Sequence, residues 1–186
     1  YLKFIKNNYF KNLNNIKNLS FIFEISKILK INFTRVLEAT NKFKGLNYRQ
    51  QIIYNSKKLT VINDSKSTSF SSTKLLLESY KNIYWILGGL AKKGDKFNLD
   101  KKYFNKIRAY IYGKDKDFFS RILLKKIKKK YAKNLNGSLK LVFKDLNKDK
   151  KKKIILFSPS AASFDQFKNF EIRGLYFNKI IKKYIQ

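Results

Sequence analysis

Three residue types are missing from this 186-residue chain: it contains no cysteine, no histidine and no methionine. Without cysteine there can be no disulfide and no thiolate metal site. Without histidine there can be neither a Ser-His-Asp triad nor a histidine-bound zinc. Because the sequence opens on Tyr1 and not on methionine, we expect it to be a piece of a longer protein. No apolar run approaches the ~20 residues of a membrane span and no signal-peptide pattern opens the chain, so no membrane partner is expected.

Acidic residues are also scarce, since 12 Asp and Glu stand against 43 Lys and Arg, for a formal net charge of +31. Such an excess is typical of proteins that bind nucleic acid. The lysines are nevertheless spread along the whole chain, with dense runs only at residues 125–130 and 148–153. We expect the first run to be the solvated face of a helix and the second a surface loop. A basic nucleic-acid-binding module without catalysis is therefore the alternative hypothesis.

The first part of the chain is predicted to be helical. Residues 1–12 have no clear period and are expected to be strand-like or irregular. Apolar spacing predicts helices over residues 18–29 and 33–43, with Asn18 and Asn32 as their N-caps. Gly45 breaks this pattern, so we place a domain boundary between residues 44 and 45.

Beyond residue 45, short apolar strands alternate with helices. The strands are expected at residues 51–54, 59–63, 83–87, 109–112 and 154–157, the first two forming a hairpin. The helices are expected at residues 69–81, 117–131, 138–146 and 169–184. Strands that are apolar throughout and separated by helices predict an open, mostly parallel α/β sheet with helices on both faces.

Small and hydroxyl-bearing residues follow three of these strands. Ser65, Lys66 and Thr68 come after residues 59–63, whereas Gly88, Gly89 and Lys92 follow residues 83–87. The last strand leads into the serine-rich turn at residues 158–163. Ligands of open α/β sheets bind at the carboxyl ends of strands, and two lysines suit the two carboxylates of a diacid. A small anionic substrate is therefore predicted, the alternative being a capped helix with a solvated lysine.

The sequence shows no motif that would carry out a catalytic step. Neither a G-x-x-x-x-G-K-[ST] phosphate loop nor a G-x-G-x-x-G run follows a strand. Asp64, Asp95 and Asp165 could act as bases, but none of them sits beside an obvious nucleophile in the sequence. The pattern predicts a binding crevice without a catalytic group.

Five segments, taken in order, resemble the C-terminal part of the Mur ligases, in the branch that adds D-glutamate. They are NNIKN at 14–18, FKGLNYR at 43–49, INDSKST at 62–68, LGGLAK at 87–92 and SPSAASFDQFKNFEIRG at 158–174. The last is the most specific. The chain departs from the family pattern at Asn14 and Tyr48, where histidines are usual.

The resemblance implies an ATP-dependent amide ligase of peptidoglycan biosynthesis, cytoplasmic and monomeric, with no specific nucleic-acid partner. ATP would phosphorylate the carboxylate of UDP-N-acetylmuramoyl-L-alanine, and the D-glutamate amine would attack the acyl phosphate. Residues 45–186 would be the Rossmann-like domain that holds D-glutamate, and residues 1–44 the end of the central ATP-binding domain. ATP and Mg²⁺ would be bound mainly by parts of the enzyme outside this chain, which would be inactive alone.

The resemblance also carries over individual residues. Six residues would surround D-glutamate: Lys66, Thr68, Lys92, Ser163, Phe164 and Phe170. Four residues would lie near the adenine and ribose of ATP: Asn15, Asn18, Arg49 and Asp64. Alternatively, Phe164 and Phe170 are plain core aromatics and Asp64 caps a turn, while Arg173 is expected to be structural. The central expectation is that Lys66 and Lys92, from neighbouring strand–helix turns, face one hollow roofed by the serine-rich turn.

Overall fold

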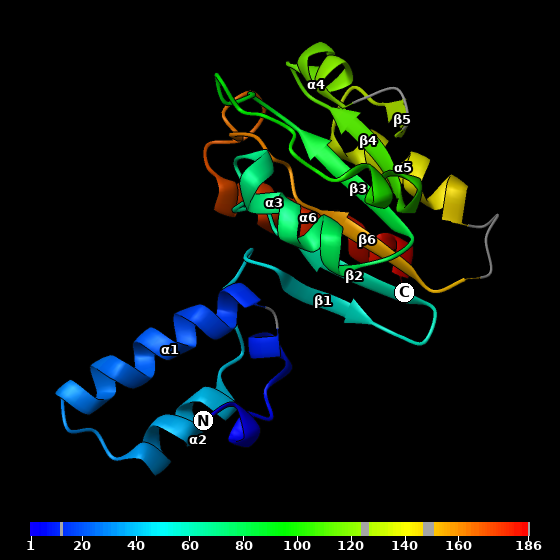
Figure 1. Cartoon of the computed structure of the whole chain (residues 1–186). Coiled ribbons are helices and arrows are strands. Elements are labelled where there is room, and N and C mark those ends of the chain that lie inside the picture. The colour runs from blue at the N-terminus through cyan, green and yellow to red at the C-terminus, as the bar shows by residue number, and fades with distance from the viewer. Residues whose placement is uncertain (12, 124–126, 147–150, 186) are drawn as a thin grey trace. The chain divides into compact units, whose positions relative to one another are not determined.

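A computed structural model describes residues 1–11, 13–123, 127–146 and 151–185 of the chain (Figure 1). They fall into two compact units, Tyr1–Leu46 and Asn47–Gln186. The positions of the two units relative to each other are not determined. The predicted boundary between residues 44 and 45 lies near this division, while the assignment of each unit to a ligase domain stays a prediction.

The first unit is helical. It consists of the short 3-10 helices η1 (Leu2–Phe4) and η2 (Asn8–Lys11) and the α-helices α1 (Leu13–Ile28) and α2 (Phe33–Lys42). A small cluster of buried apolar side chains joins them, Phe10, Leu19, Phe23 and Val36. The Asn32 side chain accepts a hydrogen bond from the Thr34 amide and thus caps α2 as predicted. Asn18, by contrast, lies inside α1 and is not its N-cap.

The second unit is built on one six-stranded sheet. Its strands are β1 (Gln51–Asn55), β2 (Leu59–Asn63), β3 (Ile83–Gly88), β4 (Ile107–Tyr112), β5 (Lys128–Tyr131) and β6 (Lys153–Phe157). Their order across the sheet is β1-β2-β6-β3-β4-β5. All neighbouring pairs are parallel except β1 with β2, the predicted hairpin, which carries an irregularity between Ile52 and Tyr54. The mostly parallel α/β sheet is confirmed.

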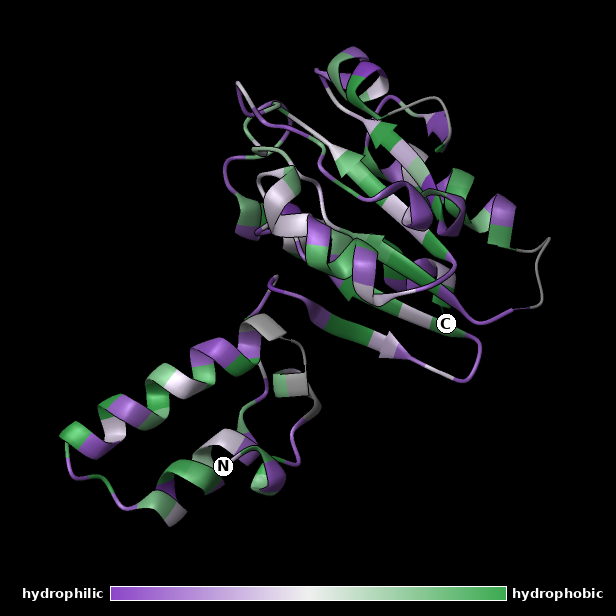
Figure 2. Ribbon diagram, viewed as in Figure 1, coloured by the Kyte–Doolittle hydropathy of each residue, from purple (hydrophilic) through white to green (hydrophobic). Residues whose placement is uncertain are grey.

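Helices cover both faces of this sheet (Figures 1 and 2). Side chains along each strand alternate between the two faces. Trp85 points to the face covered by α3 (Phe70–Ser79), α4 (Lys116–Ile122) and the 3-10 helix η3 (Lys101–Lys106). Its neighbour Tyr84 points to the other face, covered by α5 (Leu135–Leu146) and α6 (Phe170–Ile185). The central strands are largely hydrophobic and almost fully buried, which fits a sheet sandwiched between helices.

The predicted helix over residues 117–131 is wrong. Helix α4 ends at Ile122, residues 124–126 lie outside the described part, and Lys128–Tyr131 form the edge strand β5 beside β4. Lys129 and Lys130 of this run have specific partners and lie on a strand, not on a solvated helix face. Lys129 Nζ donates to the carbonyls of Ser120 and Leu123 at the end of α4. Tyr131 is 49% exposed because it lies on the edge strand of the sheet.

The second lysine run also ends differently from the prediction. Residues 147–150 lie outside the described part, but Lys153 is the first residue of β6 and not part of a surface loop. Its side chain is buried and its ammonium donates to the carbonyl of Leu146, the last residue of α5. A cation near a helix C-terminus is favourable because the carbonyls there are unpaired.

Candidate functional site

The turns that follow β2, β6, β3 and β4 meet at the carboxyl edge of the sheet, since these strands are parallel (Figure 1). The turn after β3 is hydrogen-bonded to the serine-rich turn after β6. Leu90 and Ala162 exchange two backbone hydrogen bonds, of 3.0 and 2.9 Å, and the Gly88 amide donates to the Pro159 carbonyl. The turns carrying Lys66 and Lys92 were expected to be neighbours, but they are not. Strand β6 lies between β2 and β3, so the serine-rich turn after β6 separates the two turns.

Two glycines allow this close approach. Gly88 and Gly89 have φ angles of +133° and +130°, which side chains disfavour. A Cβ on Gly88 would lie 1.9 Å from the Tyr112 carbonyl oxygen, and one on Gly89 would lie 2.3 Å from that of Ala162. Only glycine therefore fits at the end of β3.

Arg173 is hydrogen-bonded to two of the turns, the one after β2 and the one after β6. It lies in α6 with its side chain fully buried. Its Nη2 donates to the Ser65 carbonyl at 2.7 Å, its Nε to the Ser65 hydroxyl at 3.1 Å and its Nη1 to the Ala161 carbonyl at 3.0 Å. Burial lowers the pKa of the guanidinium. As expected, this arginine serves the structure: it holds the residue before Lys66 against the serine-rich turn.

Lys66 and Phe170, both predicted to bind the substrate, lie together. The ammonium nitrogen of Lys66 is 3.7 Å from the centroid of the Phe170 ring. The Lys66 amide donates to the Tyr48 carbonyl, and the Ser65 hydroxyl donates to the Phe170 carbonyl. Such a cation–π contact holds the ammonium over the ring while leaving its N–H donors available. Phe170 is thus half-buried with a polar neighbour, and is not a plain core aromatic.

The other predicted substrate residues differ in exposure. Ser163 is only 3% exposed, whereas Thr68 and Lys92 lie on the surface. Phe164 is 71% exposed on the serine-rich turn, so the alternative that it belongs to the core is wrong. The structure thus brings the turns of these residues to one edge, while a hollow shared by Lys66, Lys92 and Ser163 stays a prediction.

Asp64 is buried at the end of β2, and both of its carboxylate oxygens are engaged. Oδ1 accepts from the Gln50 amide at 3.0 Å and Oδ2 from the Ser158 hydroxyl at 2.7 Å. Burial raises the pKa of this carboxyl to about 6, although both hydrogen bonds and the charge of Arg49 lower it. Asp64 therefore ties β2 to β6 and to the turn before β1.

A buried cluster of hydroxyl groups was missed by the sequence analysis. Thr73 Oγ1 in α3 lies within 2.6–2.7 Å of the hydroxyl oxygens of Ser67, Ser158 and Ser160. Two serines of the turn after β6 therefore bind α3 and are fully buried, so they do not line an open crevice. A threonine in the first turn of a helix that follows a serine-rich loop was the available signal.

Asp95 and Asp165 hold the backbone in place. Asp95 Oδ2 accepts from the amide of Phe70, the first residue of α3, at 2.7 Å. Asp165 Oδ2 accepts from the Lys114 amide after β4 at 3.2 Å. Carboxylates used in this way orient loops. The described residues contain no group of three or more acidic, Cys or His side chains that could hold a metal ion.

The predicted nucleotide residues belong to different units. Asn15 is buried in the first unit, where its Nδ2 donates to the Tyr9 carbonyl at 2.7 Å, and Asn18 is exposed on α1. Arg49 is exposed in the second unit. The backbone of Asn14 lies in α1, and its side chain is outside the described part. That these residues approach one nucleotide stays a prediction.

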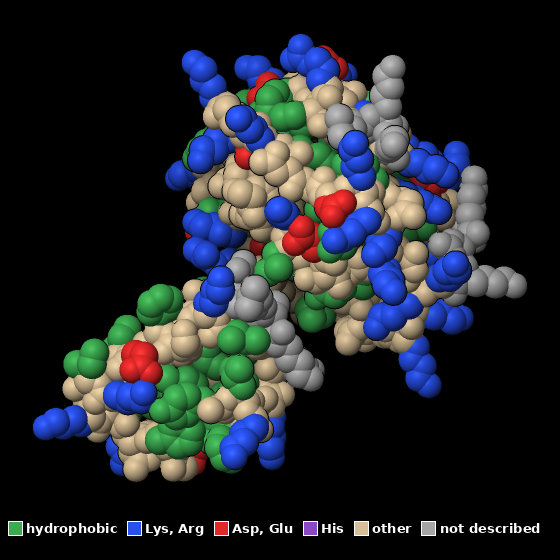
Figure 3. Space-filling view, viewed as in Figure 1, with side chains coloured by type: hydrophobic (Ala, Val, Ile, Leu, Met, Phe, Trp, Pro, Cys, Tyr) green, Lys and Arg blue, Asp and Glu red, His purple; other side chains and the backbone are tan. Residues whose placement is uncertain are grey.

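Lysine and arginine side chains are scattered over the face of the second unit seen in Figure 3 and form no continuous stripe there. Sequence-independent nucleic-acid binders typically concentrate their charge along one groove or face, so this face offers no specific support for the alternative hypothesis. Within the described residues, no helix is both long and apolar enough to cross a membrane.

Comparison with curated proteins finds relatives more than 30% identical to this chain. The chain is 36% identical over 176 residues to a UDP-N-acetylmuramoylalanine–D-glutamate ligase of Rickettsia prowazekii, covering 94% of this chain and 39% of the relative. It is 34% identical over 169 residues to the ligase of that name from Wolbachia of Brugia malayi, covering 91% of this chain and 34% of the relative. A third, from Buchnera aphidicola of Schizaphis graminum, is 37% identical over 171 residues, covering 91% and 38%. The chain thus spans little more than a third of the length of these relatives.

Solved structures show the same fold. A UDP-N-acetylmuramate-alanine ligase from Thermotoga maritima superposes with a TM-score of 0.63 at 17% identity, over 93% of this chain and 38% of that one. A pseudomurein peptide ligase type C from Methanothermus fervidus superposes with a TM-score of 0.64 at 18% identity, over 97% of this chain and 37% of that one. No family model matches the sequence. On the identity to curated relatives, the five motif segments and the shared fold, the chain belongs to the Mur ligase family.

Proposed function

We propose that this chain supplies the amino-acid-holding domain of a cytoplasmic, ATP-dependent amide ligase that joins D-glutamate to UDP-N-acetylmuramoyl-L-alanine in peptidoglycan biosynthesis. The observation that carries the proposal is the meeting of three turns at one sheet edge. Arg173 fixes the residue before Lys66 to the serine-rich turn, and the Leu90–Ala162 pair fixes the turn of Lys92 to the same segment. The relatives whose sequences match over this region carry the name of that reaction.

In this proposal Lys66 and Lys92 bind the two carboxylates of D-glutamate, and Ser163 and Thr68 add hydroxyl donors. The Lys66 ammonium would turn from the Phe170 ring to a carboxylate, because a charge-assisted hydrogen bond is stronger than an exposed cation–π contact. Phe164, exposed on the serine-rich turn, would cover the bound amino acid. These residues would orient the amine toward an acyl phosphate, so their contribution is positioning and electrostatic attraction.

The adenine and ribose of ATP would be contacted by Asn15, Asn18, Arg49 and Asp64. Mg²⁺ would be held mainly by residues outside this chain. For Asp64 the proposed contact must coexist with its bonds to Gln50 and Ser158. Asp64 could keep both of these hydrogen bonds if it contributed to the nucleotide site by fixing the backbone of residues 64–66.

A chimera tests the proposal, with this chain replacing the matching region of the Rickettsia prowazekii relative. We expect D-glutamate-dependent ADP release. Changing Lys66→Ala or Lys92→Ala should raise the KM for D-glutamate about 10- to 100-fold, since one charge-assisted hydrogen bond is worth about 1.5–3 kcal/mol. The KM for ATP should change less than about threefold, since that affinity rests on other groups.

Lys93→Ala is the matched control, because Lys93 is exposed next to Lys92. Unchanged kinetics in both lysine variants would remove Lys66 and Lys92 from the substrate site. Should the chimera be inactive, D-glutamate titration of the chain itself decides the same question.

A further inference from the structure

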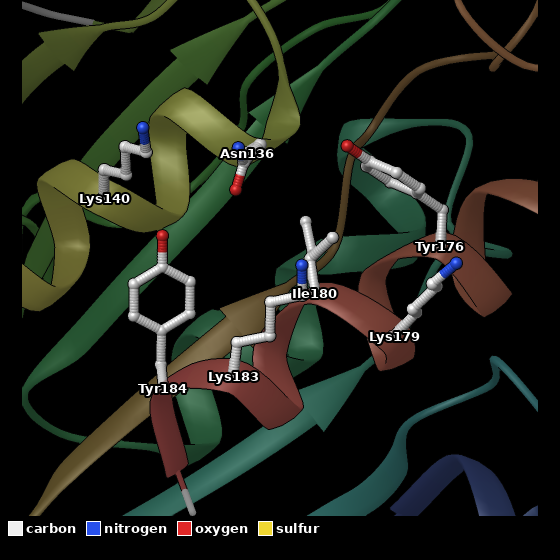
Figure 4. A pocket seen from close by; sticks show the side chains of 7 residues that line it. All are labelled: Asn136, Lys140, Tyr176, Lys179, Ile180, Lys183 and Tyr184. Carbon is white, nitrogen blue, oxygen red and sulfur yellow. The ribbon is translucent and has the colours of Figure 1, made fainter.

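A cationic hollow lies between α5 and α6, and none of the residues proposed to bind D-glutamate lines it. It has a volume of about 520 Å³, within the range of small-molecule sites. Lys140 enters it from α5, and Lys179 and Lys183 from α6 (Figure 4). None of its lining residues, all of them in the described part of the second unit, is acidic.

The three lysines are not neutralised. Within the described residues, none of them takes part in an ion pair or hydrogen bond, whereas Lys130 nearby is paired with Asp145 at 2.7 Å. Lys179 and Lys183 are four residues apart on one helix, a spacing at which like charges repel. An anion in the hollow would relieve this repulsion.

The walls of the hollow are fixed by packing. The Tyr184 ring stacks on Phe143 of α5, with centroids 4.5 Å apart and an interplanar angle of 13°. Tyr176 packs against Phe167 with centroids 5.4 Å apart. Ile180, only 6% exposed, contributes to the apolar lining between them. Tyr176, Tyr184 and Asn136 also line the hollow, and their phenol hydroxyls and amide carry hydrogen-bond donors.

We propose that this hollow binds a small anion with two or more linked phosphate groups, either inorganic polyphosphate or the phosphate chain of a nucleotide. Lysine is a common phosphate ligand that acts as a point charge. Three ammonium groups from two helices match several charges spread along a chain of phosphates, and exceed what a single carboxylate needs. This inference goes beyond the proposed ligase function and does not depend on it.

Two triple variants of equal charge provide the test. The first, Lys140→Gln/Lys179→Gln/Lys183→Gln, removes the lysines of the hollow. The second, Lys57→Gln/Lys101→Gln/Lys182→Gln, removes three exposed lysines that do not line the hollow, one of them on α6. Binding of sodium triphosphate and of ATP is measured by calorimetry at fixed ionic strength. We expect at least a tenfold loss of triphosphate affinity in the first variant and less than a twofold loss in the second.

Equal losses in the two variants would mean diffuse attraction by the net charge and would overturn the proposal, as would no binding to the unaltered chain. A Lys66→Ala/Lys92→Ala variant should bind triphosphate as the unaltered chain does; loss there would assign the anion to the carboxyl edge. Because ATP can also bind at the nucleotide residues proposed above, the source is judged from the affinity lost in the first variant. A larger loss for ATP than for triphosphate would identify a nucleotide as the source of the phosphates, and an equal or smaller loss would identify the phosphate chain alone. If the first variant lost only single-stranded RNA binding, the hollow would be an RNA contact and the proposal would fall.

Discussion

All three guanidinium nitrogens of Arg173 donate to Ser65 or Ala161, inside a region with no exposed surface. The sequence identified Arg173 as structural but not its partners, because these lie 108 and 12 residues away. The same holds for two hydroxyl neighbours of Thr73, Ser158 and Ser160, which lie 85 and 87 residues away. Motif residues were therefore predictable as a set, whereas their hydrogen-bond partners were not.

Arg173→Lys should destabilise the folded chain by about 2–4 kcal/mol, because one ammonium cannot replace the guanidinium fork and leaves buried carbonyls unpaired. Urea unfolding followed by circular dichroism measures the loss. Arg121→Lys, at an exposed position in α4, should change the free energy of unfolding by less than about 0.5 kcal/mol. Equal stability of the two variants would show that Arg173 does not hold the turns together.

Asp64 makes stability depend on pH, since burial raises its pKa to about 6. An acid with a raised folded-state pKa binds its proton more tightly in the folded chain. Its ionisation therefore destabilises the fold as the pH rises from about 4 to above 6. Relative to Asp64→Asn, the native chain should lose about 2–3 kcal/mol of unfolding free energy over that interval. Chemical unfolding of both proteins at pH 4, 5, 6 and 7 checks this; a constant difference between them would contradict it.

At the scale of the element, buried strands and capped helices were predictable because apolar runs and cap residues are local signals. The edge strand β5 was not. Its Lys-Lys-Lys-Tyr sequence carries no apolar alternation, and pairing with β4 is what makes it a strand. Lys130 is held there by Asp145 of α5. Burial alone would raise the pKa of Asp145, but hydrogen bonds from Lys130 and Tyr110 outweigh burial and keep that pKa below its usual value.

Helix α6 packs closely on the turn before β1, and Gly174 makes this possible. A Cβ at Gly174 would lie 2.3 Å from Cδ1 of the Tyr48 ring. Gly174→Ala should therefore destabilise the chain by about 1–3 kcal/mol through overpacking. In a Tyr48→Ala background the same change should be close to neutral, because the clashing ring is gone.

A double-mutant cycle on the free energies of unfolding gives the coupling between the two sites. Additive effects would mean that Tyr48, where the family usually has histidine, does not pack on α6.

At the scale of the whole molecule, the sequence predicted the α/β class and a division of the chain, but not how much of the first unit is exposed. Phe21, Ile25 and Ile28 of α1 are 54–78% exposed. Four buried apolar side chains make a small core for that unit. The second unit has two extensive apolar clusters, one on each face of its sheet. The carboxyl edge belongs to this better-packed unit, which suits a site that must hold a ligand in a fixed geometry.

In the proposed function, D-glutamate binds at that edge, between the turns of Lys66, Lys92 and Ser163. Titration of ¹⁵N-labelled chain with D-glutamate, with L-glutamate at equal ionic strength as the control, tests it most directly. We predict amide shifts in residues 64–69, 88–93 and 160–170 that are larger for the D enantiomer and are lost in Lys66→Ala/Lys92→Ala. Equal responses to both enantiomers, or shifts confined to other regions such as the hollow between α5 and α6, would contradict the account.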